Sequence, residues 1–304
     1  MTKSAVLICG HGSRDAAAVD EFEALAAALA RHFPETDLAA GYLEFARPTI
    51  RDALAALYAR GARRILAVPA MLFAASHVKN DLPWEVNSFA AEHPDVDIRL
   101  GRDLSIDAKL LGAAAACIAE TDGDGAARRA ESLLVIVGRG TNDPDANSNI
   151  SKLARMLWEG MGFAWAETAF SGVAQPRVAP ALERAARLGF RRIVVFPYFL
   201  FTGVLVKRVY AETDRAAPLF PAIEFVKAPY LRDHPLVVET FLDRIAEIDS
   251  GDPRMNCQLC KYRAQLVGYE KDVGAVQAAH HHHVRGIGTD ADHHQHHHHD
   301  HDRS

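Results

Sequence analysis

The chain has 304 residues, of which 49% are hydrophobic, so it can bury the cores of two ordinary domains and still carry a tail. Its formal net charge of −5 and its lack of a basic stripe with interleaved aromatic residues argue against nucleic acid as a partner. No segment approaches the ~20 consecutive apolar residues of a membrane span. The N-terminus has no signal peptide pattern and four cysteines are too few for a disulfide framework, so we expect a cytoplasmic protein.

Strand and helix patterns alternate regularly along the first part of the chain. Short runs rich in Val, Leu and Ile predict buried parallel strands, and segments of helical periodicity predict helices between them. Pro48 begins one helix and Gly61 ends it, because proline suits the first helical turn and glycine the position after the last. The expected order is strand 4–9, helix 16–32, strand 38–45, helix 48–60, strand 64–69, a helix from about 76, strand 96–100 and helix 106–118.

The same order repeats after a linker at 123–127. The expected elements are strand 133–137, helix 147–159, strand 163–170, helix 176–188, strand 193–196, helix 204–216, strand 223–226 and helix 234–248. The amino-acid sequence repeats as well, since GHGS at 10–13 aligns with GRGT at 138–141 and Pro48 aligns with Pro176. This internal duplication predicts an α/β fold of two tandem domains, each a small parallel sheet with helices on both faces.

We therefore expect one domain over 1–125, a second over 130–249 and a separate segment over 250–304. The last segment has a single C-x-x-C and then a histidine-rich stretch, with 11 of the 16 histidines after residue 279. Its composition is of low complexity and cannot bury a core, which predicts disorder.

Three polar side chains of the first repeat follow or end predicted strands. His11 follows the first strand, Glu44 lies at the end of the second, and His77 follows the third. Ligands bind beyond the carboxyl ends of parallel strands. Taken singly, such a histidine is more often a loop residue or helix cap, and such a glutamate is usually solvated. Together over one sheet edge, two imidazoles and a carboxylate favour a site for a divalent transition metal.

Three segments carry a family resemblance, namely LICGHGSRD, YLEFARP and PAMLFAASHVKNDLP. They resemble the sirohydrochlorin chelatases of the class II, ferrochelatase-like group, and the layout over residues 4–248 is similar to that of the long sirohydrochlorin cobaltochelatases. The resemblance implies two tandem chelatase-like domains and ATP-independent insertion of cobalt(II) into sirohydrochlorin during cobalamin biosynthesis. It also implies that His11 and His77 are catalytic and bind the metal, and that Glu44 assists them.

Sirohydrochlorin is a polycarboxylate, so its binding site needs groups that bind anions. Ser13, beside a predicted helix N-terminus, and the cations Arg14, Lys79 and Arg139 are the expected substrate-binding residues. The alternative for Arg139 is an ion pair with a carboxylate such as Asp143. Surface charge without a special task is the alternative for the other cations.

The second repeat lacks the proposed ligands. It has Arg139, Gly172 and Leu205 where the first repeat has His11, Glu44 and His77, and neither arginine nor leucine replaces a metal-binding imidazole. We therefore expect a single active site in the first repeat, with the second repeat forming the other wall of a cleft.

The terminal segment has two features with open interpretations. By resemblance, Cys257 and Cys260 belong to an iron–sulfur centre, but two thiols alone do not complete a cluster, and a redox thiol pair or a zinc site are the alternatives. The histidine clusters read either as an expression tag or as a metal store. Their interruption by Gln295, Asp300 and Asp302 favours metal storage or delivery.

Other functions are compatible with parts of this pattern. A siroheme-forming ferrochelatase would use the same site, and a metal storage or chaperone protein would bind metal without altering a tetrapyrrole. A histidine phosphatase is disfavoured because Gly10, not arginine, precedes His11. The chain has no Walker A phosphate loop, so ATP-driven insertion is not expected. A homodimer is compatible with the sequence.

Overall fold

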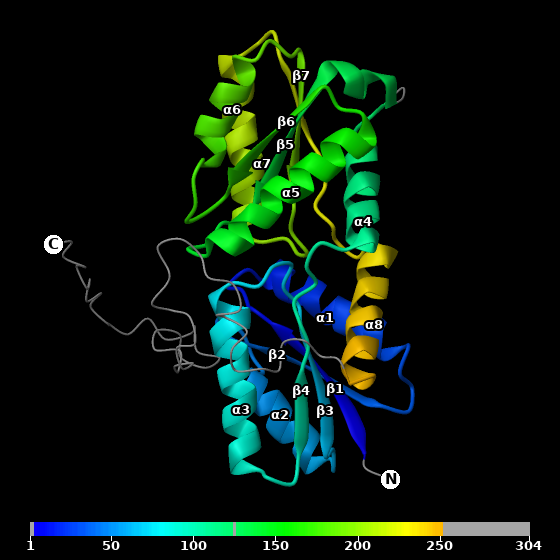
Figure 1. Cartoon of the computed structure of the whole chain (residues 1–304). Helices are drawn as coiled ribbons and strands as arrows, with labels where there is room; N and C mark the ends of the chain where they lie inside the picture. The colour runs from blue at the N-terminus through cyan, green and yellow to red at the C-terminus, as the bar shows by residue number, and fades with distance from the viewer. Residues whose placement is uncertain (1–2, 124–125, 252–304) are drawn as a thin grey trace, which may run out of the picture.

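The computed structural model describes residues 3–123 and 126–251. The chain forms two α/β lobes stacked end to end (Figure 1), each built on a four-stranded parallel sheet with helices packed on it. The strand orders are β2-β1-β3-β4 and β6-β5-β7-β8, so the two sheets have the same topology. The predicted fold class is thereby confirmed. Cys257, Cys260 and the histidine-rich stretch lie outside the described residues.

The elements of the first repeat follow the predicted order. They are β1 (Ser4–Gly10), α1 (Ala16–Ala30), β2 (Asp37–Tyr42), α2 (Ile50–Ala59), β3 (Arg64–Pro69), the π-helix η1 (His77–Asp81), α3 (Leu82–Glu92), β4 (Asp97–Leu100) and α4 (Ala108–Ala119). The π turn is a departure from the continuous helix expected from about residue 76. It closes through the Leu82 N–H, which donates to the His77 carbonyl five residues earlier.

The second repeat also has the predicted order. Two short 3-10 turns, η2 (Ala126–Glu131) and η3 (Ala217–Leu219), accompany β5 (Ser132–Gly138), α5 (Pro144–Met161), β6 (Trp165–Phe170), α6 (Val178–Ala186), β7 (Arg192–Pro197), α7 (Val204–Ala216), β8 (Glu224–Lys227) and α8 (Pro235–Asp249). Helix α5 begins three residues earlier than expected, because the Asp143 side chain accepts hydrogen bonds from the Asp145 and Ala146 N–H groups and caps it there.

The two repeats exchange their last helices. Helix α8 of the second repeat packs on β3 and α1 in the lobe of the first repeat. Helix α4 of the first repeat lies beside α5 in the other lobe (Figure 1). Gly101 permits this packing, since a Cβ there would lie 2.5 Å from Ile248 Cδ1. The lobes in space therefore differ from the predicted segments 1–125 and 130–249 by this exchange, which ties the two repeats together.

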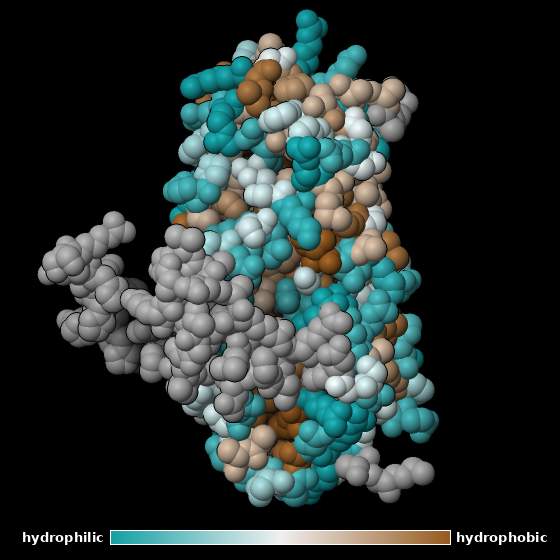
Figure 2. Space-filling model, viewed as in Figure 1, coloured by the Kyte–Doolittle hydropathy of each residue, from teal (hydrophilic) through white to brown (hydrophobic). Residues whose placement is uncertain are grey.

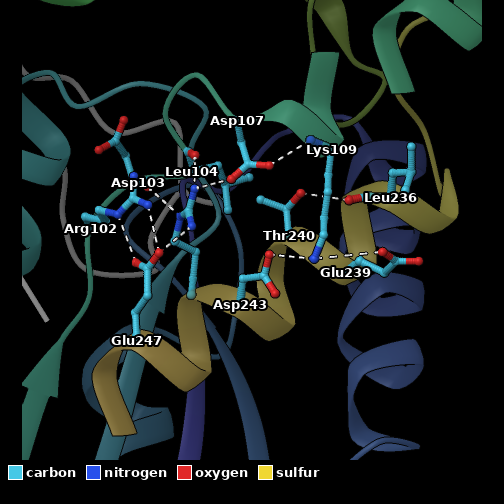
Figure 3. A network of polar contacts seen from close by, with 11 residues as sticks. Arg102, Asp103, Leu104, Asp107, Lys109, Leu236, Glu239, Thr240, Asp243 and Glu247 are labelled. Carbon is cyan, nitrogen blue, oxygen red and sulfur yellow. Dashed lines mark hydrogen bonds and ion pairs between the residues drawn. The ribbon is translucent and has the colours of Figure 1, made fainter. Parts of the chain in front are cut away.

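A buried arginine anchors α8 to the loop that follows β4. Arg244 is 2% exposed, and its guanidinium donates to the Leu104 carbonyl at 2.7 Å and pairs with Asp107 at 2.9 Å. On the same helix, Glu247 accepts two hydrogen bonds from Arg102 (Figure 3). A buried charge is tolerated only when it is paired in this way, so the network holds α8 in one position on the first lobe.

On the face shown in Figure 2, hydrophilic and hydrophobic residues are interspersed over both lobes. Within 3–123 and 126–251, no helix combines the length and the apolar character needed to cross a bilayer.

Candidate active site

A cavity of about 540 Å³ lies where the two repeats face each other. Residues that follow β1 and β3 of one sheet and β5 and β7 of the other contribute to its walls, as expected for a ligand site beyond the carboxyl ends of parallel strands. Most of the lining is aromatic or aliphatic, including Phe22, Phe45, Leu72, Phe73, Tyr198, Phe199, Phe201 and Val204. The cleft between the repeats that the sequence suggested is therefore present, and its walls are mainly apolar.

The loop after β1 brings His11 and Glu44 together. The Glu44 N–H donates to the His11 carbonyl at 3.0 Å, which continues the pairing of β1 with β2 beyond both strands. Gly12 makes this approach feasible, because its φ is 96° and a Cβ on it would lie 1.7 Å from the Glu44 carbonyl oxygen. The GHGS motif is thus a tight backbone turn as well as the source of a histidine.

His11, Glu44 and His77 form a cluster with the geometry of a metal site. One ligand atom from each lies within 4.8 Å of the others, and His11 Nε2 is 3.2 Å from Glu44 Oε1. The two imidazole rings are 4.6 Å apart and nearly perpendicular. Glu44 is 3% exposed, and burial raises its pKa while the nearby His77 opposes the rise. The structure therefore brings the three predicted residues together, and among the described residues no other such cluster occurs.

A fourth residue, Asp81, was not anticipated from the sequence. Its Oδ2 lies 2.6 Å from His77 Nδ1, and the carboxylate is almost fully buried. The two residues are the first and last of the π turn, and their four-residue spacing places them on the same side of it. A carboxylate at one ring nitrogen orients an imidazole and leaves the other nitrogen, here Nε2, to bind a metal. The available signal was the four-residue spacing in HVKND.

Arg139 reaches this cluster from the second repeat. Its Nη2 lies 2.8 Å from His11 Nε2, and it lines the cavity. Although Arg139 is an exposed residue, the surrounding protein desolvates its guanidinium and lowers its pKa, an effect that Glu44 opposes. The alternative pairing with Asp143 is not what the structure shows, because Asp143 caps α5 and binds Lys79 instead.

Two other predicted substrate-binding residues lie at the cavity. The Arg14 guanidinium stacks over the Phe45 ring, 4.9 Å from its centroid, and both residues line the wall. Ser13 also lines the wall, and its Oγ accepts a hydrogen bond from the Asp15 N–H at 3.0 Å. Both positions fit the predicted contact with substrate carboxylates, which stays a prediction.

Lys79, the remaining predicted substrate-binding residue, pairs with carboxylates of the second repeat. It does not belong to the cavity lining, and its ammonium pairs with Asp143 at 2.7 Å and with Asp145 at 3.0 Å. Its side chain is almost buried, so these carboxylates of the second repeat hold the charge that the sequence assigned to substrate. The geometry supports a structural role for Lys79 between the repeats, and its predicted contact with substrate stays a prediction.

The second repeat keeps the backbone of the site and lacks its ligands. Gly140 has a φ of 83°, and a Cβ on it would lie 2.0 Å from the Gly172 carbonyl oxygen, as at Gly12 and Glu44. Leu205 lines the cavity at the position equivalent to His77. The second repeat thus contributes an apolar wall and Arg139.

Comparison with known proteins gives the same picture. The CbiX family model matches residues 5–121 and again 133–248, one match for each repeat. The chain is 33% identical to a sirohydrochlorin cobaltochelatase of Priestia megaterium, over 86% of this chain and 85% of that protein. It is 30% identical to a sirohydrochlorin ferrochelatase of the same organism, over 76% of this chain and 85% of that protein.

A solved structure shows the same architecture. The structure of SirB from Bacillus subtilis with Fe3+ is 27% identical, has a TM-score of 0.73, and matches 83% of this chain and 99% of that one. The family resemblance carried by the three sequence motifs is therefore confirmed by two independent kinds of comparison. This protein belongs to the CbiX family.

Proposed function

We propose that this protein inserts a divalent metal, cobalt(II), into sirohydrochlorin without ATP, in the early cobalt insertion of cobalamin biosynthesis. The observation that carries the proposal is the cluster of His11, Glu44 and His77 beside an apolar cavity between the repeats. The names of its relatives support a chelatase, and one of them is a cobaltochelatase.

The donor set suits a metal that must be released again. Two imidazole nitrogens and one carboxylate oxygen bind first-row divalent ions, and a set of only three protein ligands leaves coordination positions for water or for substrate nitrogens. His77 is oriented for this by Asp81, and His11 by its own loop, where Nδ1 lies 3.0 Å from the Gly12 carbonyl. These contacts use Nδ1 of each ring, so Nε2 is the nitrogen that would bind the metal.

Insertion also needs proton acceptors. One divalent ion replaces two pyrrole N–H protons, so two protons must leave the macrocycle for each metal that enters. Imidazole accepts protons near neutral pH because its ordinary pKa is ~6.5. Burial raises the pKa of Glu44, which makes its carboxylate a better proton acceptor than an exposed one. We assign metal binding and proton acceptance jointly to His11, His77 and Glu44.

The cavity offers a matching surface for the macrocycle. Its aromatic and aliphatic walls suit the flat tetrapyrrole, and its volume is in the ~300–1,000 Å³ range of small-molecule sites. Arg14, Arg139 and Ser13 line those walls, and we assign them to the carboxylates of the macrocycle. The macrocycle would lie between the two repeats, with its centre facing the cluster.

The test is a visible absorption time course of purified protein with sirohydrochlorin and cobalt(II), against a mixture without protein. A chelatase converts the metal-free spectrum to that of the cobalt complex faster than the control. A protein that binds cobalt and leaves the macrocycle spectrum unchanged is a metal storage protein or chaperone, and the proposal fails.

The second candidate is insertion of iron(II) for siroheme, favoured by the relative named as a ferrochelatase. The same time course with iron(II) and nickel(II) under anaerobic conditions ranks the metals. Turnover with iron that exceeds turnover with cobalt would replace the cobaltochelatase assignment by a ferrochelatase one.

A further inference from the structure

Arg139 occupies the nitrogen of His11 that faces the metal site. His11 Nδ1 lies 3.0 Å from the Gly12 carbonyl oxygen, which can only accept, so Nδ1 carries the proton. In a neutral ring Nε2 then has a lone pair. The guanidinium of Arg139 has only donors, and its Nη2 lies 2.8 Å from that lone pair. The second repeat therefore donates a hydrogen bond into the position where a metal would bind.

The charges lead to the same conclusion. His11 Nε2 and Glu44 Oε1 lie 3.2 Å apart, and a lone pair and a carboxylate oxygen converge so closely only where a cation or donor serves both. A divalent ion does this in a metal complex. In this structure the positive charge of Arg139 acts on Glu44. An arginine cannot give up its proton near neutral pH, so the guanidinium must move away before a metal ion occupies the site.

We propose that Arg139 is a stand-in cation, which blocks the metal-facing nitrogen of His11 in the substrate-free protein and leaves it when a substrate carboxylate draws it away. The inference rests on the proposed function, since it takes the incoming ligand to be a polycarboxylate macrocycle. Arg139 lines the cavity, so the carboxylate would approach it from the solvent side. Macrocycle binding then opens the site to metal, and the two ligands bind with positive coupling.

The experiment is a titration of the full chain with cobalt(II), without tetrapyrrole, in which calorimetry measures the heat of binding. The signal of a variant with both His11→Ala and His77→Ala is subtracted, which removes metal bound by histidines elsewhere. Arg139→Gln should bind cobalt at this site about tenfold or more tightly than the unmodified protein, a change that corresponds to about 1.4 kcal/mol. A second titration, of sirohydrochlorin without metal, tests the carboxylate contact: Arg139→Gln should bind the macrocycle more weakly than the unmodified protein.

Arg14→Gln is the matched control, because Arg14 also lines the cavity and also acts on Glu44 by its charge. A stand-in role predicts a much smaller gain in cobalt affinity for Arg14→Gln than for Arg139→Gln. Equal gains would mean that any nearby positive charge has the same effect, and would overturn the inference, as would unchanged or weaker cobalt binding in Arg139→Gln. This titration needs no turnover, so its failure is separate from a failure of the spectral assay for insertion.

Discussion

Lys79 and Lys207 occupy equivalent positions in the two repeats, and each pairs with the aspartate that caps the first helix of the other repeat. Lys79 binds Asp143 at the start of α5, and Lys207 binds Asp15 at the start of α1. The pairs are therefore related by the internal duplication. They differ in exposure, since the Lys79 side chain is 10% exposed and that of Lys207 is 60% exposed.

This difference predicts unequal effects of removing the two charges. Lys79→Met should lower the free energy of unfolding by about 2 kcal/mol, because it leaves a half-buried carboxylate without its ammonium. Lys207→Met should cost about 0.5 kcal/mol or less, as is usual for a solvated pair. Urea unfolding of both variants measures this, and equal losses would contradict the structural role of Lys79.

The proposed ligands should be indispensable for insertion. His11→Ala and His77→Ala should each lower the rate by ~100- to 10,000-fold, the usual range for a lost acid–base group. His93→Ala is the matched control, because His93 stacks on Phe89 and is absent from the cavity lining. Circular dichroism checks the fold. Near-normal turnover of either variant at saturating metal removes that histidine from the mechanism.

Asp81 should act through His77. Asp81→Asn keeps an acceptor near His77 Nδ1 and removes the negative charge, so metal binding should weaken about 10- to 100-fold. The expected signature is a rise in KM for cobalt that exceeds any fall in kcat. A loss of kcat alone, with KM unchanged, would argue that Asp81 has another role.

Asp103 should make stability depend on pH. Burial raises its pKa to about 6, opposed by the hydrogen bond from the Ala74 N–H and by Arg102. Because the folded pKa exceeds the ordinary value of ~3.9, the folded state holds this proton more tightly, and that contribution is lost as pH rises from about 4 through 6. Ionised Asp103 thus destabilises the protein at neutral pH, by on the order of 2–3 kcal/mol.

Asp103→Asn removes this titration and keeps an acceptor for Ala74. Relative to the unmodified protein, the variant should gain stability between about pH 4 and 6, and the gain should level off above that range. Chemical unfolding of both proteins across this range measures the difference. A difference that does not vary with pH would show that Asp103 has no raised pKa.

The segment after α8 should serve metal supply. A chain ending at Asp249 should retain insertion at saturating cobalt and lose rate when cobalt is scarce, because histidine clusters raise the local metal concentration.

Full-length protein with Cys257→Ser and Cys260→Ser separates the role of the thiols from that of the histidines. Iron–sulfur absorption that survives in this variant would exclude both thiols as ligands, and inactivity of a folded truncated chain at saturating metal would make the segment catalytic.

Much of the fold could be predicted because it depends on local patterns. Buried strands such as β1 and β5 are continuous apolar runs, and caps such as Asp143 act within a few residues of themselves. The convergence of His11, Glu44 and His77 was predictable as well, because the carboxyl ends of neighbouring parallel strands meet at one edge.

Other features were decided by tertiary structure. Exchange of α4 and α8 depends on which apolar faces fit, such as Ile248 over Gly101, and helical periodicity does not encode the partner. The four-residue spacing of His77 and Asp81 lets a helical turn bring them together, but only the tertiary structure buries Asp81 at this site.

The sequence by itself determined the duplicated α/β repeats and the residue types of one metal cluster, because both follow from short-range pattern and strand order. Only the tertiary structure decided that Lys79 pairs with Asp143 and that Arg139 lies on His11. Both contacts cross from one repeat to the other. Their partners follow from the relative placement of the two lobes, which rests on many long-range packing contacts that no local segment specifies.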